Sequence, residues 1–315
     1  MANDSTENIS VKGQLVGIWF STRWLIFFCL LIWITMIIAN GMVDDWGRLT
    51  NGGENLVVFI EESLWPPDWS VLEPQSYPPC VVAPGFQFTC STAWIGLVET
   101  LKIAFVSTVL GIIISLPISL FAARNLNSTW VTYPARFILA ASRSLPSIIW
   151  AIFFVILVGL GPLSGILAMT VYTVGYLGKL QYEAIEGIPS APLEASQAMG
   201  HSWLERSFGV VLPESANGLI SQAIFMFEYN FRHGTVIGIV GAGGIGYYIN
   251  LYLKFLQYDK VIAYLILIFV VVLLLDLVSI RARSFFTEGG DVSRISWWSI
   301  LLPASMLSNS QDEVE

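Results

Sequence analysis

Long apolar runs alternate with shorter polar segments along most of the chain. Several of these runs approach or exceed the ~20 residues that an α-helix needs to cross the hydrocarbon core of a bilayer. The pattern therefore predicts an all-α membrane protein with about six transmembrane helices. They are expected over residues 24–43, 94–122, 137–160, 163–178, 216–246 and 261–280.

The polar segments divide the chain around these spans. We expect an N-terminal segment at 1–23, a long loop at 44–93, a core transmembrane domain at 94–283 and a tail at 284–315. A signal peptide is the alternative for the first apolar run. The run is long for a leader and offers a poor cleavage site, so a retained first span at 24–43 is expected.

The basic residues lie unevenly on the two sides that six spans would define. An even number of spans places both termini on one side of the membrane. The positive-inside rule then puts the termini in the cytoplasm and the acidic 44–93 loop outside. The cytoplasmic side would hold Lys12, Arg23, Arg124, Arg136, Lys179, Arg206, Arg281, Arg283 and Arg294, and the other side Arg48, Lys254 and Lys260, with Lys102 nearby.

Composition supports the membrane class and argues against several functions. The chain is 55% hydrophobic and 12% charged, whereas soluble domains carry about 25% charged residues. A net charge of −8 without a basic patch argues against nucleic-acid binding. No Cys/His cluster has metal-ligand spacing, and neither a catalytic constellation nor an ATP-binding phosphate loop is present in the sequence. We therefore expect no bound metal or cofactor and no enzymatic activity of the chain itself.

Two of the three cysteines share the long polar loop. Cys80 and Cys90 could form a disulfide if that loop faces an oxidising compartment, and two unpaired thiols are the alternative. Cys29 lies in the first apolar run, where packing explains it.

Charged residues inside the fifth apolar run are a first candidate for function. Glu228, Asn230 and Arg232 lie there, where charges are costly and usually face a bundle interior or an aqueous path. Glu228 and Arg232 are four residues apart, so they share a helix face and can pair. Mutual neutralisation and a role in a substrate pathway are both open.

A second polar spot lies near the start of the third run. Arg143 and Ser144 precede Pro146, and Arg143 either extends to the cytoplasmic edge of the membrane or faces a pathway. Guanidinium groups suit oxyanions because they offer planar, multidentate donors. Together the two spots indicate an anion path.

A glycine-rich stretch closes the fifth run. It superficially resembles a dinucleotide-binding loop, but that loop follows a strand in a soluble domain, and here a membrane span precedes it. Glycines at this density instead predict an unwound helix or close backbone packing. The residues concerned are Gly241, Gly243, Gly244 and Gly246.

The segment at 194–213 is the longest polar stretch within the apolar core domain. A helix opening at Ala191 or Pro192 can end at Gly200, and Ser202 with Glu205 forms a capping box for a second helix. Pro213 predicts a break after this second helix. We expect this helix–glycine–helix elbow to lie outside the bilayer and to receive force from another protein.

The elbow residues resemble the EAA motif of binding-protein-dependent ABC importer permeases. That motif reads Glu-Ala-Ala, three residues, Gly, nine residues, Ile, one residue, Leu-Pro. The chain departs from it mildly at Ser196 and Val210. The resemblance implies type I ABC importer permease architecture, with coupling helices at 182–213 that dock in a groove of the ATPase. The matching residues are Glu194, Ala195, Ser196, Gly200, Val210, Leu212 and Pro213.

Further stretches resemble phosphonate-type permeases over roughly residues 55–283. They are residues 66–69, 143–151, 159–165, 227–232 and 235–246. The resemblance implies import of phosphonate, phosphite or related phosphorus oxyanions across a bacterial inner membrane. The alternatives are an ABC importer permease for another small solute such as methionine, and an ion-coupled secondary transporter.

The resemblance also implies partners. Two copies of an ATP-binding subunit, carrying ATP and Mg, would dock on the elbows of two permease copies, which are expected to be identical. An extracytoplasmic solute-binding protein would deliver the anion, and membrane lipid would surround the spans. ATP binding would swing the coupling helices and switch the bundle between inward- and outward-open states.

Overall fold

The computed structural model describes residues 24–43, 45–75, 80 and 87–287. Within these ranges the chain is helical, apart from connecting loops and one isolated antiparallel bridge between Pro74 and Ser91. The chain divides into two compact units, residues 1–63 and 64–315. The expectations for residues 1–23 and 288–315 fall outside the described residues.

The first unit contains a helix over Trp24–Met42 that is long and apolar enough to cross a membrane. Its side chains are exposed almost throughout, which suits a helix surrounded by lipid. A second helix, α2 (Gly47–Phe59), follows and continues into a π-helical turn at Ile60–Leu64. Part of the segment predicted as a loop at 44–93 is therefore helical.

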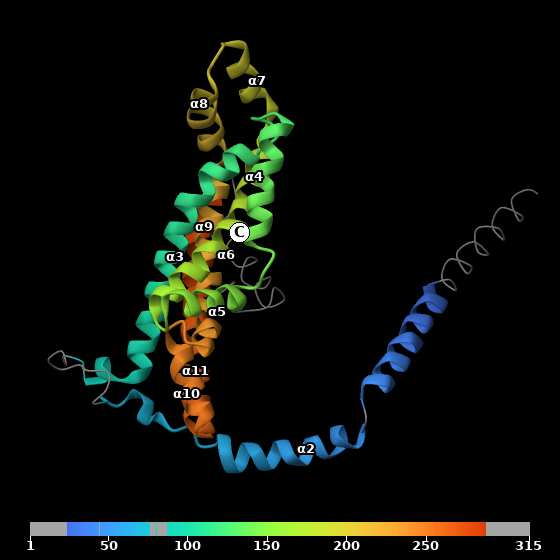
Figure 1. Cartoon of the computed structure of the whole chain (residues 1–315), viewed down its shortest axis with the longest axis vertical. Helices are drawn as coiled ribbons and strands as arrows, with labels where there is room; N and C mark the ends of the chain where they lie inside the picture. Colours follow the sequence, from blue (N-terminus) through green and yellow to red (C-terminus); the bar gives the residue numbers. More distant parts are fainter. Residues whose placement is uncertain (1–23, 44, 76–79, 81–86, 288–315) are drawn as a thin grey trace, which may run out of the picture. The chain divides into compact units, whose positions relative to one another are not determined.

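The second unit holds the remaining apolar helices (Figure 1). The described residues contain five helices that could span a membrane, or six if one bent pair counts as a single span. This agrees with the predicted number. In chain order the helices of this unit are α3 (Thr92–Ala122), α4 (Thr129–Ser142), α5 (Ser147–Val158), α6 (Pro162–Glu186), α7 (Ser190–Ala198), α8 (Trp203–Arg206), α9 (Leu212–Ile237), α10 (Ile245–Lys254) and α11 (Tyr258–Thr287).

The predicted third span is not one helix. α4 and α5 meet at an angle of 80° at the break between Ser142 and Ser147. Pro146 caps α5, and a proline disfavours helical geometry in the residue before it. The apolar run continues across the break, which is why the hydrophobic pattern alone predicted a single span at 137–160.

The predicted break at Pro213 is also wrong. A π-helical turn at Ser207–Val211 joins α8 to α9, and Pro213 lies in the first turn of α9. A proline is tolerated in a first turn, and a π-turn accommodates local irregularity within a helix. Helical structure therefore runs from the elbow directly into the membrane domain.

The helix α3 lies at the centre of the second unit. It packs against α4, α6, α9 and α10. Small side chains bring the helices close together; for example, Gly111 of α3 contacts Thr173 of α6 with no room for a Cβ atom. At the start of α3, the Thr92 and Tyr264 hydroxyls form a buried hydrogen bond of 2.7 Å that ties α3 to α11.

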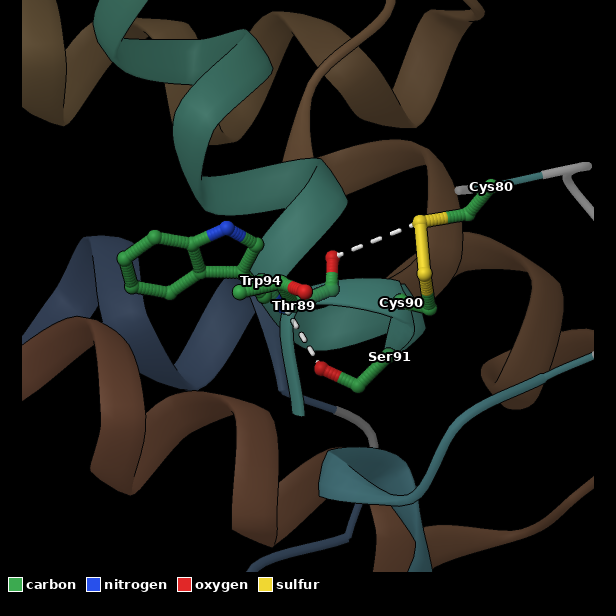
Figure 2. The surroundings of a disulfide bond; sticks show 5 residues. All are labelled: Cys80, Thr89, Cys90, Ser91 and Trp94. Atoms are coloured by element: carbon green, nitrogen blue, oxygen red, sulfur yellow. Dashed lines mark hydrogen bonds between the residues drawn. A yellow bond between two sulfur atoms is a disulfide. The ribbon is translucent and has the colours of Figure 1, made fainter. Parts of the chain in front are cut away.

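A disulfide between Cys80 and Cys90 closes the polar loop just before α3 (Figure 2). The Cα atoms of the two cysteines are 5.5 Å apart, and Cys90 is buried. Directly after it, the Ser91 hydroxyl caps α3 by accepting the Trp94 backbone N–H at 3.1 Å. The disulfide thus fixes the loop to the first turn of a central helix.

Candidate functional site

The elbow has the predicted order of helix, glycine and helix. After α7, Gly200 adopts φ = +74°, which an L-residue rarely adopts, although nothing lies within 4 Å of the position of a Cβ atom. Ser202 and Glu205 form the predicted capping box, with the Ser202 N–H donating to Glu205 at 2.7 Å. The bend therefore requires glycine for its backbone conformation and not for lack of space.

The elbow is firmly attached to the end of α3. Trp203 stacks on Phe121 with ring centroids 5.1 Å apart, and its indole N–H donates to Asn127 at 3.0 Å. Leu193 and Val211 are buried against apolar residues that include Leu120 and Ile185. α7 and α8 lie at one end of the unit in Figure 1, so a force on them would reach α3 and α9 through packed side chains.

The residues of the elbow motif differ in exposure. Glu194, Ala195, Gly200 and Pro213 are exposed, Val210 and Leu212 are half-buried, and Ser196 is buried with its hydroxyl 2.9 Å from Nδ1 of His201.

The structure also exposes three large apolar side chains on the elbow that were not predicted. Met199 is 66% exposed, and Leu204 and Phe208 are each 60% exposed. These residues lie in a segment that the sequence predicted to be outside the bilayer. Large apolar side chains in such a segment could have been recognised from the sequence as contacts for a partner protein.

Arg232 is held by two carboxylates. It forms the predicted pair with Glu228 at 2.5 Å and a second ion pair with Asp276 of α11 at 2.6 Å. Arg283 lies 3.5 Å from the other oxygen of Glu228. Sequence reasoning missed Asp276, although it is the one charged residue of the sixth predicted span. The network joins α9 to α11 and already neutralises Arg232.

Asn230 is fully buried between three helices. Its amide nitrogen donates to the hydroxyl oxygens of Thr108 at 2.8 Å and Thr173 at 2.9 Å. The side chain therefore ties α9 to α3 and α6 in this structure.

Arg143 and Ser144 lie at the break between α4 and α5, and both are exposed. The Ser144 hydroxyl donates to the Ala141 carbonyl at 2.8 Å. Within the described part of the chain, Arg143 has no carboxylate within ion-pair distance. The two candidate arginines therefore differ, because Arg232 is ion-paired with carboxylates and Arg143 is not ion-paired with any carboxylate of the described residues.

The glycine-rich stretch unwinds the helix as predicted. Gly241, Gly243 and Gly244 have positive φ values of 89°, 82° and 76° and connect a 3-10 turn at Gly238–Val240 to α10. The Thr100 hydroxyl of α3 accepts the Ile245 N–H at 2.9 Å at the start of α10. Gly246 packs against the backbone of α9 so closely that no Cβ atom would fit.

The described residues thus form a bundle of helices that are long and apolar enough to span a membrane, with a helix–glycine–helix elbow at one end. The chain belongs to the family described as the binding-protein-dependent transport system inner membrane component, whose sequence profile matches residues 115–282. This family comprises the permeases of ABC importers, as the elbow motif predicted.

Two curated relatives are permeases for phosphorus compounds. The chain is 37% identical to the phosphite transport system permease protein PtxC of Stutzerimonas stutzeri, over 77% of this chain and 82% of that protein. It is 36% identical to the phosphate-import permease protein PhnE of Mycolicibacterium smegmatis, over 64% of this chain but only 39% of that longer protein.

A solved transporter structure has the same fold. The inward-facing MetNI methionine ABC transporter matches with a TM-score of 0.55 and 27% sequence identity, over 62% of this chain and 97% of the matched chain. The similarity confirms the predicted type I importer permease architecture.

Proposed function

We propose that the chain is the permease subunit of an ATP-driven importer of phosphonate, phosphite or related phosphorus oxyanions. The observation that carries this proposal is the 37% identity to a phosphite permease over 82% of that relative's length. The similarity to a methionine transporter is weaker in sequence, at 27% identity. Methionine is therefore the second candidate, and membership of a family of binding-protein-dependent permeases argues against the ion-coupled alternative.

The elbow is the proposed docking site for the ATPase. Glu194 is exposed on α7 and Gly200 is exposed at the bend. The apolar side chains of Met199, Leu204 and Phe208 suit insertion into a groove of a partner. Two ATP-binding subunits, which bring ATP and Mg, would dock on two identical permease copies. Because the helix continues from α8 into α9, movement of the elbow would turn α9 directly.

We place the termini in the cytoplasm of a bacterium whose inner membrane holds the complex. The disulfide between Cys80 and Cys90 supports an outward-facing 44–93 loop, because disulfides persist in oxidising compartments. A solute-binding protein would dock on this outer side.

Arg143 and Ser144 are the proposed contacts for the anion in the pathway. Their exposed position at a helix break within the membrane domain is typical of substrate sites in transporters. Glu228, Asn230 and Arg232 were also predicted to line the pathway. We now assign to them the joining of α9 to its neighbours, because their polar groups are already paired.

Growth on defined phosphorus sources tests the proposed cargo. A bacterial strain without its own phosphorus uptake systems would express the chain with its neighbouring ATPase and binding protein. We expect growth on phosphite or a simple phosphonate, and loss of growth when the ATPase is inactivated. Rescue of a methionine auxotroph in place of growth on phosphorus compounds would support the second candidate.

A further inference from the structure

A cluster of polar aromatic side chains lies where α5, α6 and α9 meet. Tyr172 of α6 stacks with Tyr229 and His233 of α9, and Tyr176 of α6 stacks with Tyr229. The ring centroids of Tyr229 and His233 are 4.2 Å apart. Ser147, the first residue of α5, places its hydroxyl 3.0 Å from Nδ1 of His233. We name these five residues the tyrosine–histidine cluster.

The cluster keeps hydrogen-bond donors available whichever way its protons are arranged. The hydroxyls of Tyr172 and Tyr229 are 2.9 Å apart, so one donates and the other retains its own proton. If Ser147 donates to Nδ1 of His233, the neutral ring carries its proton on Nε2, and that N–H is the unused donor. If Nδ1 donates to Ser147 instead, the Ser147 hydroxyl proton is the unused donor. Each pair therefore has one unused donor within the described part of the chain.

The cluster is not fully enclosed. Tyr172, Tyr176, Tyr229 and His233 are all half-buried, in contrast to the fully buried Asn230 on the same helix as Tyr229. Unused donors at the edge of a membrane domain suit a polar ligand, because a polar group that leaves water must be compensated by hydrogen bonds.

The charge beside the cluster favours an anion. The backbone of Arg143 packs against Gly175, which lies between Tyr172 and Tyr176 along α6 and has no room for a Cβ atom. Arg143, an exposed residue, therefore lies in the segment that packs on α6 beside the cluster and leads into Ser147, four residues later.

The ring geometry argues against a cationic ligand such as a quaternary ammonium group. Such ligands are held by several aromatic faces that surround the cation. Here Tyr172 and Tyr229 are inclined by only 9°, with ring centroids 6.1 Å apart, and Tyr176 and Tyr229 by 12°, with centroids 5.4 Å apart. These rings are nearly parallel, so their faces do not surround a common point. The ring edges with their hydroxyl groups remain as the binding groups.

We propose that the tyrosine–histidine cluster, together with Arg143, forms a hydrogen-bonding station for the tetrahedral oxyanion during its passage through the permease. The proposal rests on the proposed function and adds residues that determine which anion passes. Hydroxyl and imidazole N–H groups would donate to the oxygen atoms of the anion, and Arg143 would compensate its charge.

Variants that remove donors but keep the ring stack test this station in the complete complex. Tyr172→Phe/Tyr229→Phe and His233→Phe retain aromatic rings, whereas His233→Gln retains a donor without the ring. Tyr247→Phe, on the exposed face of α10, is the matched control. Uptake of radiolabelled phosphite and phosphate into proteoliposomes would be measured together with basal ATP hydrolysis and thermal stability.

We expect the phenylalanine variants to lose about tenfold or more in phosphite uptake, the effect of one lost hydrogen bond to a charged group. The control Tyr247→Phe should keep wild-type uptake, basal hydrolysis and thermal stability, and His233→Gln should recover part of the uptake. Wild-type phosphite uptake in both phenylalanine variants would overturn the proposed station. Higher uptake in His233→Phe than in His233→Gln would also overturn it, because the ring and not the donor would then matter.

A labelling experiment covers the case in which these variants do not assemble. Tyr176→Cys, at a half-buried position of the cluster, should react with a small water-soluble thiol reagent in a Cys29→Ala background. Saturating phosphite with the binding protein should slow this reaction during turnover. Equal rates with and without phosphite would contradict the station. A wild-type complex that moves no phosphorus oxyanion would instead contradict the proposed function, so the two failures are distinguishable.

Discussion

The guanidinium group of Arg232 lies 2.6 Å from a carboxylate oxygen of Asp276, and this ion pair joins α9 to α11. The same guanidinium group binds Glu228 at 2.5 Å, so an arginine in the middle of an apolar domain is matched by two acidic groups. A paired arginine stabilises helix packing, and the two carboxylates already balance the charge that would attract an anion.

The pair of Arg232 and Asp276 should stabilise the bundle. Both side chains are partly exposed in the single chain, at 44% and 36%. We therefore expect Asp276→Asn to cost about 1–2 kcal/mol of stability, between the values for exposed and buried pairs. Thermal unfolding of the complex, in a double-mutant cycle with Arg232→Gln, measures the coupling energy. Additive effects of the two substitutions would contradict the pairing.

Replacing both partners distinguishes a packing role from an anion-binding role. We expect Arg232→Met/Asp276→Leu to retain most phosphite uptake, because apolar side chains of similar size can substitute for an ion pair and Glu228 keeps Arg283 as a cationic partner at 3.5 Å. Arg143→Gln should lose uptake in the same assay while the complex still assembles. Loss of uptake in the double variant at normal stability would show that Arg232 meets the anion, as the sequence alone suggested.

Gly200 should be needed for coupling because of its backbone conformation. A β-branched residue at φ = +74° is strained by about 1–2 kcal/mol, whereas asparagine tolerates this region. We expect Gly200→Val to lower the number of anions imported per ATP hydrolysed, and Gly200→Asn to remain close to wild type. Gly209→Ala, in the neighbouring π-turn, is the control because it has open space and no positive φ. Equal coupling ratios in all three variants would refute this role.

The cysteines of the outer loop report the orientation of the chain. In intact cells with a Cys29→Ala background, a membrane-impermeant maleimide should label nothing until Cys80 and Cys90 are reduced. After mild reduction, the exposed thiol of Cys80 should be labelled from outside. Labelling that requires permeabilised membranes would place the 44–93 loop in the cytoplasm.

Asp68 should make the outer loop sensitive to acid. The backbone N–H of Ser70 is the main cause that lowers the pKa of Asp68, and the Ser70 hydroxyl and Lys260 add to it, against a smaller opposing effect of burial. Since the folded pKa lies below the unfolded value of about 3.9, ionised Asp68 stabilises the loop above about pH 4. This stabilisation is lost as the pH falls through the folded pKa.

Hydrogen-exchange protection of the 3-10 turn at Trp69–Leu72 measures this effect. Protection factors should be constant from neutral pH to about pH 5 and should fall in more acidic buffer. Asp68→Asn should weaken the pH dependence, and Glu73→Gln, at an exposed neighbouring position, should not. The same acid profile in Asp68→Asn as in the wild type would exclude Asp68 as the cause.

Local signals in the sequence predicted much of the fold and of the elbow. Apolar runs long enough to span a bilayer predicted the number of spans, and Gly200 with the box at Ser202 and Glu205 predicted the bend. The spacing of Glu228 and Arg232 predicted their ion pair. Each of these features depends on residues that are close in sequence, so helical periodicity and capping chemistry suffice.

The sequence did not predict features that depend on distant residues, or on local preferences for and against a helix that nearly cancel. The 80° bend between α4 and α5 was not apparent because the apolar run continues through it. Pro213 was read as a break, since the π-turn that accommodates it has no clear sequence signal. Asp276 and the tyrosine–histidine cluster involve partners on other helices, and in isolation each aromatic residue of a membrane span is explained by packing.

Reconstitution of the permease with its ATPase and binding protein in proteoliposomes tests the proposed function most directly. We predict ATP-dependent accumulation of phosphite that excess methylphosphonate or phosphate reduces and excess methionine leaves unchanged. Accumulation of methionine without any phosphorus oxyanion, or phosphite uptake that continues without ATP, would contradict it.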